Sequence, residues 1–169
     1  RVAANQLVLV STGANDGFAS SGTLEPAPGG YTLNAKKAFC SGSPGGDLLV
    51  TSAVLDPGSE GAQVFHFAVP FTAKGVKVGS DWDTLGMRGT ASHDLVFEDV
   101  FVPAEKIAGT RPYGELAGPL LVAAIHFAPL AGAAYLGVAA GACDEAIRLA
   151  KPGAVRQVGD MRCRLRVAL

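Results

Sequence analysis

The segment from Asp81 to Pro103, DWDTLGMRGTASHDLVFEDVFVP, contains the residue types that acid–base chemistry requires. Arg88 and His93 lie there among several carboxylates, and such groups can move protons or hold an anion. Glycines on both sides of Arg88 supply turns, however, and the segment then becomes strand-like. We therefore interpret Arg88 as an ion-pair or hydrogen-bond anchor for these turns. A bulge is expected at Glu98-Asp99 in the strand that follows.

The cysteines favour neither a metal site nor a disulfide framework. Cys40, Cys143 and Cys163 are odd in number and far apart, and they show no CxxC or Cys/His ligand spacing. We expect no bound metal. A reduced, intracellular setting is the simpler interpretation, which makes the cytoplasm the expected location.

The composition is that of a folded, turn-rich chain. Its 169 residues are 49% hydrophobic and 17% charged, with 22 glycines and 10 prolines. A formal net charge of −1 provides no field that would attract nucleic acid or an anionic membrane, so neither is an expected partner. The chain opens without Met and stops within a helical pattern, so we expect a piece of a longer protein.

The order of the predicted elements indicates two structural units. Short alternating runs with turn residues between them continue to Pro103, and helical patterns follow over 116–151 and 154–169. The fold class is therefore a segregated α+β fold, an antiparallel β-barrel or sandwich followed by helices of an α-helical bundle. We place the β-domain at residues 1–108 and the incomplete helical domain at 109–169.

One helical segment is apolar enough to resemble a membrane span. Residues 118–143 contain no Asp, Glu, Lys or Arg. Alanine and glycine dominate the segment, Pro129 interrupts it, and no basic flank or aromatic belt follows, so a buried bundle helix is favoured. The join at Lys151–Ala154 is either a tight helical hairpin or a place where residues are missing.

Three motifs in order resemble the acyl-CoA dehydrogenase family of flavoproteins. An apolar strand ends in a hydroxyl residue, YTLNAKKAFCS follows at 31–41, and LGMRGTAS with VFEDVFVP follows at 85–92 and 96–103. The likeness runs from about Leu7 to the end of the chain. It implies the family's middle β-domain followed by the first helices of a four-helix bundle.

The resemblance implies a flavin-binding site on the β-domain. It places a hydroxyl donor to the flavin pyrimidine edge at Thr12, with Ser11 as the adjacent candidate. It also places an aromatic residue along the ring at Phe39, and at Ser41 a hydroxyl near the reactive nitrogen. Fixed donors at the polar edge would stabilise the electron-rich ring, and a flat apolar side chain would exclude water. The implied cofactor is FAD, with FMN as the alternative.

The reaction that the resemblance implies, and our main prediction, is FAD-dependent Cα–Cβ oxidation of an acyl-CoA. The catalytic base, a glutamate in the family, is expected outside this chain, and an electron acceptor is the expected partner. The sequences FCSGSPGGDLL and DWDTLGMRGTAS are more similar to the dibenzothiophene-type branch of the superfamily. This likeness implies the alternative function, a monooxygenase that uses reduced flavin, O2 and a flavin reductase. A non-catalytic binding or assembly module is the third possibility. The C-terminal helices are expected to join a homodimer or homotetramer.

Overall fold

Apolar residues at every second position build the sheet of the first unit. In β5 (Gln63–Pro70), Phe65, Phe67 and Val69 are buried on one face, whereas His66 between them is only half-buried. The computed structural model describes residues 2–12, 16, 19–116 and 118–168. It divides the chain into two units, residues 1–117 and 118–169.

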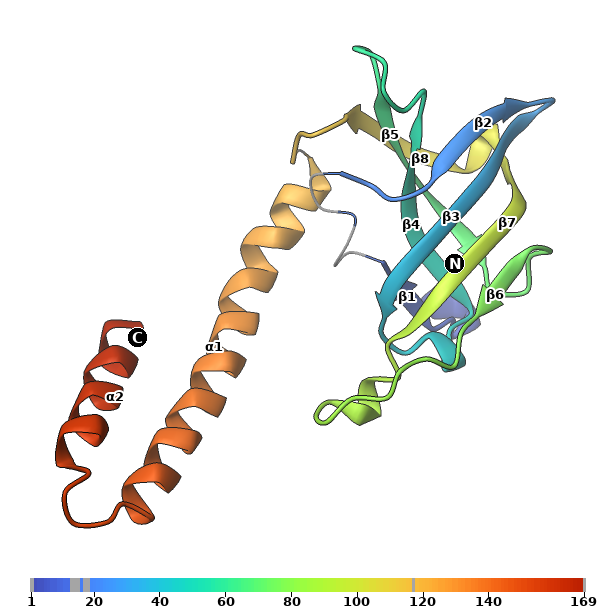
Figure 1. Ribbon diagram of the computed structural model, residues 1–169. Coiled ribbons are helices and arrows are strands. Elements are labelled where there is room, and N and C mark those ends of the chain that lie inside the picture. The colour runs from blue at the N-terminus through green and yellow to red at the C-terminus, as the bar shows by residue number, and fades with distance from the viewer. Residues whose placement is uncertain (1, 13–15, 17–18, 117, 169) are drawn as a thin grey trace. The chain divides into compact units, whose positions relative to one another are not determined.

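Eight strands form the sheet (Figure 1). The order of seven strands across it is β6-β7-β3-β2-β4-β5-β8, and β1 pairs with β4. The β1–β4 and β2–β4 pairs are parallel and the other pairs are antiparallel. Besides β5, the strands are β1 (Leu9–Ser11), β2 (Thr23–Ala27), β3 (Gly30–Cys40), β4 (Leu48–Leu55), β6 (Val76–Val78), β7 (His93–Pro103) and β8 (Ile107–Pro112).

The predicted segregated α+β class is confirmed, although the sheet is not closed into a barrel. One hydrophobic cluster forms the core of the first unit and joins residues from most of the strands. Its most deeply buried members include Leu24, Leu33, Leu49, Phe67, Leu95, Phe97, Val100 and Val102. This core fixes which side chains of β3 point inward.

Two bulges interrupt the long β3–β7 ladder, where pairing shifts between Leu33 and Ala35 and again between Lys37 and Cys40. At the first shift, Glu98 and Asp99 of β7 lie opposite the single residue Asn34 of β3. Asp99 has a left-handed φ of 50°. Asn34 stabilises this bulge, because its Oδ1 accepts from the Asp99 N–H at 2.9 Å and its Nδ2 donates to Asp99 Oδ1 at 3.0 Å. The bulge expected at Glu98-Asp99 is therefore present.

The end of the first unit lies beyond β8. This strand pairs with β5 through residues Ile107–Pro112, and the division between the units follows at 117/118. The expected boundary at 108/109 falls inside β8, because that strand completes the edge of the sheet.

Two helices make up the second unit. They are α1 (Pro119–Arg148) and α2 (Val155–Ala168), and a short turn in which Gly153 has a φ of 104° joins them. Apolar side chains of both helices, including Leu136, Cys143 and Leu165, line a groove where they meet.

The long helix α1 is apolar and largely uncovered within the described chain. Tyr135, Val138 and Phe127 are among its exposed large side chains. By length and composition, Leu120–Arg148 could cross a membrane. The expected burial of this helix is therefore not provided by the described residues.

Candidate flavin-binding site

The second bulge decides the direction of the side chains at the end of β3. Lys37 pairs with Leu95 and Cys40 pairs with His93, so β3 carries one more residue than β7 in this interval. Phe39 lies inside the bulge with a left-handed φ of 60°. Lys37 and Cys40 therefore both point into the core, while Phe39 is 55% exposed.

Phe39 contacts an aromatic residue from the loop before β7. The Trp82 ring meets it edge-to-face, with 6.3 Å between the ring centroids. Trp82 is itself held at both ends: its backbone N–H donates to His93 Nδ1 at 3.0 Å and its indole N–H donates to the Met87 carbonyl at 3.2 Å. The result is an exposed aromatic surface whose position is fixed by hydrogen bonds.

Ser41 follows directly after β3 and begins a chain of three hydroxyl groups. Ser41 Oγ lies 2.8 Å from Ser92 Oγ, and Ser92 Oγ lies 2.8 Å from Thr90 Oγ1. Thr90 Oγ1 in turn donates to the Met87 carbonyl at 2.8 Å. Ser41 is exposed, whereas Ser92 is 5% exposed.

Backbone contacts hold the two segments of this hydroxyl chain together. The Gly42 N–H donates to the Thr90 carbonyl at 2.8 Å, and Ser43 Oγ donates to the Ala91 carbonyl at 3.5 Å. The loop also contains left-handed residues at Met87 and Ala91, on either side of a 3-10 turn. Residues in this backbone region carry strain that surrounding contacts must offset.

Arg88 has the anchoring contacts that the sequence predicted. Its guanidinium lies 3.3 Å from an Asp83 carboxylate oxygen and donates to the Thr84 carbonyl at 3.4 Å. Both partners belong to the same turn region, and the side chains of the ion pair are exposed. Arg88 therefore contributes to the loop rather than to the aromatic surface.

The two predicted hydroxyl residues of β1 face in opposite directions. Ser11 is exposed, whereas Thr12 is 1% exposed. The Thr12 hydroxyl donates to Asp16 Oδ2 and lies 2.8 Å from Thr51 Oγ1. Because its single proton is directed to a buried carboxylate, the Thr12 side chain is not positioned as a donor to an external ligand, and the outward position on β1 belongs to Ser11.

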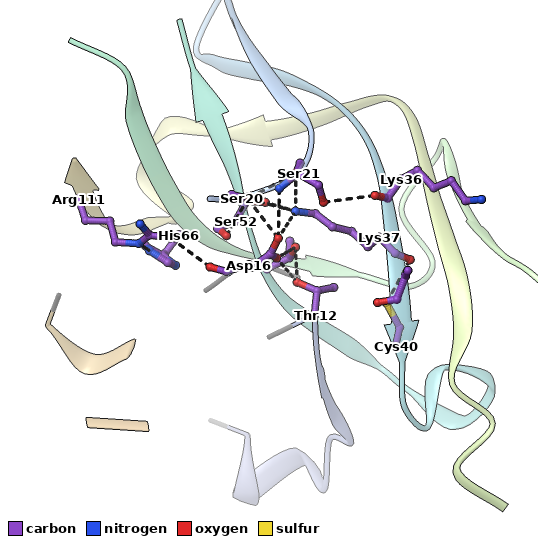
Figure 2. Close-up of polar contacts among 12 residues, drawn as sticks. Thr12, Asp16, Ser20, Ser21, Lys36, Lys37, Cys40, Ser52, His66 and Arg111 are labelled. Carbon is purple, nitrogen blue, oxygen red and sulfur yellow. Dashed lines mark hydrogen bonds and ion pairs between the residues drawn. The ribbon is translucent and has the colours of Figure 1, made fainter. Parts of the chain in front are cut away.

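A buried lysine, Lys37, lies within a polar network that includes Asp16, Ser20 and Ser52 (Figure 2). Lys37 has 0% exposure, and its Nζ donates to Asp16 Oδ1 at 2.7 Å and to the Ser52 carbonyl at 2.7 Å. It also donates to Ser20 Oγ at 3.1 Å and to the Ser21 carbonyl. This network connects β3 to β4 and to the described residues that follow β1, so it joins Thr12 to the strand that carries Phe39.

Burial shifts the ionisation of two residues on β3. Desolvation lowers the pKa of Lys37, although the adjacent Asp16 carboxylate favours the charged form. Desolvation also raises the pKa of the Cys40 thiol to about 11, with Asp16 contributing in the same direction. Cys40 is therefore an inert core thiol and not a nucleophile.

Arg111 of β8 is a second buried cation in this part of the molecule. Its Nε donates to His66 Nε2 at 3.2 Å, and its Nη2 donates to the Asp16 carbonyl at 3.1 Å (Figure 2). Burial and the Arg111 charge lower the pKa of His66, whose Nε2 acts as an acceptor here. His66 is thus half-buried in a polar contact.

Lys37 was not among the predicted site residues, although the sequence contains a signal for it. Leu33, Ala35 and Lys37 have the same parity in β3, and a period of two places all three on the inward face. A lysine on a core face requires acceptors, and Asp16 and Ser20 supply them from a separate segment. The pairing with Asp16 could not be read from spacing alone.

The fold and these motifs are those of a flavoprotein β-domain. The acyl-CoA dehydrogenase middle domain matches residues 11–100, more than half of the chain. The chain belongs to the acyl-CoA dehydrogenase family.

Known proteins similar to this chain include both oxygenases and dehydrogenases. Dibenzothiophene monooxygenase from Rhodococcus erythropolis is 37% identical over 123 residues, which cover 70% of this chain and 30% of the relative. Isovaleryl-CoA dehydrogenase from Oryza sativa subsp. japonica is 33% identical over 90 residues, covering 53% of this chain and 22% of the relative. This chain therefore spans less than a third of the length of these relatives.

A solved structure shows the same fold over nearly the whole chain. KijD3 in complex with FMN and dTDP-3-amino-2,3,6-trideoxy-4-keto-3-methyl-D-glucose matches with a TM-score of 0.67 and 26% identity. The match covers 96% of this chain and 42% of KijD3.

Proposed function

We propose that the full-length protein is a flavin-dependent monooxygenase that uses reduced flavin and O2 to oxidise a small molecule. The observation that carries the proposal is the pair formed by exposed Phe39 and exposed Ser41 at the end of β3. A left-handed backbone at a large residue and the exposure of its aromatic ring both cost free energy. Such features are typical of surfaces that bind a ligand. The similarity to dibenzothiophene monooxygenase supports this reaction over the alternatives.

The residues at this end of the sheet fit a flavin ring. Phe39 offers a flat apolar surface and Ser41 offers a hydroxyl two residues away, with Ser11 as the outward hydroxyl of β1. Either FMN or FAD presents the same ring to these groups. When bound, reduced flavin supplies two electrons to O2, so that one oxygen atom enters the substrate and the other leaves as water.

The contributions of the chain itself are exclusion of water and orientation. Phe39, held by Trp82, would cover a face of a bound ring and keep water from it. Ser41, held by Ser92, would supply one polar atom at a fixed position near the ring. The buried Lys37–Asp16 pair links β3, which carries Phe39, to a described residue that follows β1.

Acyl-CoA dehydrogenation with FAD is the second candidate, favoured by the similarity to isovaleryl-CoA dehydrogenase. That reaction requires a carboxylate base, and within the family we expect it in the part of the protein beyond this chain. A separate electron acceptor would then replace the flavin reductase as partner.

Two measurements on the full-length protein, loaded with FMN or with FAD, separate the candidates: oxygen uptake under aerobic conditions and anaerobic titration with acyl-CoA. Oxygen uptake that requires both a flavin reductase and a small-molecule substrate supports the monooxygenase. Bleaching of the oxidised flavin by acyl-CoA alone supports the dehydrogenase instead. If purified full-length protein binds neither flavin, both enzyme functions fail and a non-catalytic assembly module remains.

A variant tests whether Phe39 forms the flavin surface. Phe39→Ala should weaken flavin binding by about fivefold or more, because stacking on an aromatic side chain typically contributes about 1–3 kcal/mol in analogous ring contacts. Phe101→Ala is the matched control, since Phe101 is a comparably exposed aromatic residue on β7. Equal flavin affinity in the two variants would contradict the assignment of Phe39.

A further inference from the structure

We propose that the Ser41–Ser92–Thr90 hydroxyl chain makes Ser41 a hydrogen-bond acceptor and thereby selects reduced flavin over oxidised flavin. The proposal rests on the proposed function, because it concerns the form of the flavin that this site holds. The family resemblance places the Ser41 hydroxyl near the reactive nitrogen of the ring, and the hydroxyl chain adds the direction of its proton.

The direction of the chain follows from its last acceptor. The Met87 carbonyl has no proton, so the contact of 2.8 Å with Thr90 Oγ1 requires the Thr90 hydroxyl to donate. A hydroxyl has one proton, so Thr90 must accept from Ser92 across their 2.8 Å contact. Ser92 has then used its own proton and must accept from Ser41 at 2.8 Å. The Ser41 proton therefore points inward, and its lone pairs are directed outward.

Independent contacts keep the Met87 carbonyl in place as the end of the chain. The Trp82 indole N–H donates to it at 3.2 Å and the Thr90 backbone N–H donates at 3.1 Å. The Trp82 indole N–H, the Thr90 N–H and the Thr90 hydroxyl all donate to this carbonyl oxygen, which can only accept. Ser92 is almost fully buried and has no room to exchange its partners for water.

The two redox forms of a flavin differ at the ring nitrogen that accepts hydride. The reduced ring carries an N–H there, whereas the oxidised ring has only a lone pair. An outward acceptor at Ser41 pairs with the N–H of the reduced form. The same acceptor opposes the lone pair of the oxidised form, which leaves two acceptors facing each other without a proton.

This selection suits an enzyme that receives its flavin already reduced. Oxidised flavin, bound less tightly, leaves the site more readily after turnover. A dehydrogenase has the opposite requirement, since it must hold oxidised flavin before the substrate arrives. The direction of this hydroxyl chain therefore favours the monooxygenase over the dehydrogenase.

The test measures dissociation constants for oxidised and reduced FMN and FAD with the full-length protein under anaerobic conditions. Wild-type protein should bind the reduced form more tightly. Thr90→Val removes the acceptor for the Ser92 proton, so that the Ser41–Ser92 contact can run in either direction. We expect this variant to bind oxidised flavin about fivefold more tightly, with unchanged affinity for the reduced form.

Three other variants complete the experiment. Thr90→Ser keeps the hydroxyl and should behave as wild type. Ser92→Ala should show the same gain for oxidised flavin as Thr90→Val, because Ser41 then has no inward acceptor. Ser41→Ala should weaken binding of the reduced form and remove the preference. A fivefold change in the affinity ratio corresponds to a fall of about 20 mV in the two-electron midpoint potential of bound flavin.

The outcomes separate this proposal from the function on which it rests. If the wild-type protein binds neither form, the proposed function fails. If it binds both forms equally, or if Thr90→Val weakens both forms equally, the proposed selection is overturned while flavin binding stands. A structural defect cannot imitate the expected result, because damage does not tighten the binding of one redox form.

Discussion

Replacing Lys37 by Met tests whether the buried ion pair holds the β-domain together. The substitution keeps the length of the side chain but removes an ammonium group that donates to Asp16 Oδ1 at 2.7 Å. It also leaves the Ser52 and Ser21 carbonyls without this donor. The Asp16 carboxylate would then be a buried charge that accepts from the hydroxyl groups of Thr12, Ser20 and Thr51 and from the Ser21 backbone N–H, with no ammonium group to pair with it.

The expected cost is about 3–5 kcal/mol, which is typical when one partner of a buried ion pair is removed. Both side chains of the pair are almost fully buried, with exposures of 0% for Lys37 and 6% for Asp16. A typical domain is stable by only about 5–15 kcal/mol, so the substitution should remove a large part of the total. The companion double variant Lys37→Met/Asp16→Asn should recover part of the loss, because it removes the unpaired charge.

The neighbouring residue supplies a matched control. Lys36 also forms an ion pair, with Asp94 at 2.9 Å, but its side chain is 69% exposed. Lys36→Met should therefore cost no more than about 1 kcal/mol. The two substitutions are chemically identical and differ in burial.

Hydrogen–deuterium exchange of the full-length protein provides the assay. Peptides covering β2, β3 and β4 report the free energy of local opening, which avoids assigning one unfolding transition to a multidomain protein. Faster exchange of these peptides in Lys37→Met than in Lys36→Met is expected. Equal exchange in the two variants would refute the conclusion that the buried pair stabilises the sheet.

Three further predictions concern other residues of the sheet. Burial raises the pKa of the Cys40 thiol from 9.0 to about 11, so the neutral thiol stabilises the fold below pH 9 and this contribution is lost as the pH rises toward 11. Thermal unfolding should therefore show a smaller loss of stability between pH 9 and 11 in Cys40→Ala than in the wild-type protein. Gly75→Ala should cost more than Gly29→Ala by about 2 kcal/mol or more in denaturant unfolding, since both have a positive φ but an added Cβ at Gly75 would lie 2.1 Å from the Glu98 carbonyl oxygen. Phe39→Gly should change the free energy of unfolding by no more than about 1 kcal/mol, because relief of the left-handed strain offsets the lost ring contact.

The class of fold and the order of its elements could be predicted from sequence because they depend on local patterns. Alternation and turn residues mark the strands, and the change to a helical pattern marks the second unit. The bulge at Asp99 was also predictable, since two acidic residues interrupt an apolar alternation that resumes out of phase at Val100. Each of these signals lies within a few residues of the feature that it predicts.

The interior contacts of the candidate site depend on residues that are distant in the sequence. Thr12 has the expected position at the end of β1, but its hydroxyl is directed inward by Asp16 and Thr51. Likewise, the direction of the Ser41 hydroxyl depends on Ser92 and on a carbonyl of the loop before β7. A strand-end hydroxyl in the sequence does not show whether its proton points to a ligand or to the protein.

The second bulge of β3 explains why the polar core and the exposed aromatic surface occur together. In a regular strand, Lys37 and Phe39 would have the same parity and would both point inward, and Cys40 would point outward. The additional residue in this interval lets Lys37 and Cys40 both enter the core while Phe39 turns out. One local irregularity thus anchors the strand from within through Asp16 and presents its aromatic residue on the surface. A change that restored regular pairing here would therefore damage the core and the candidate site at once.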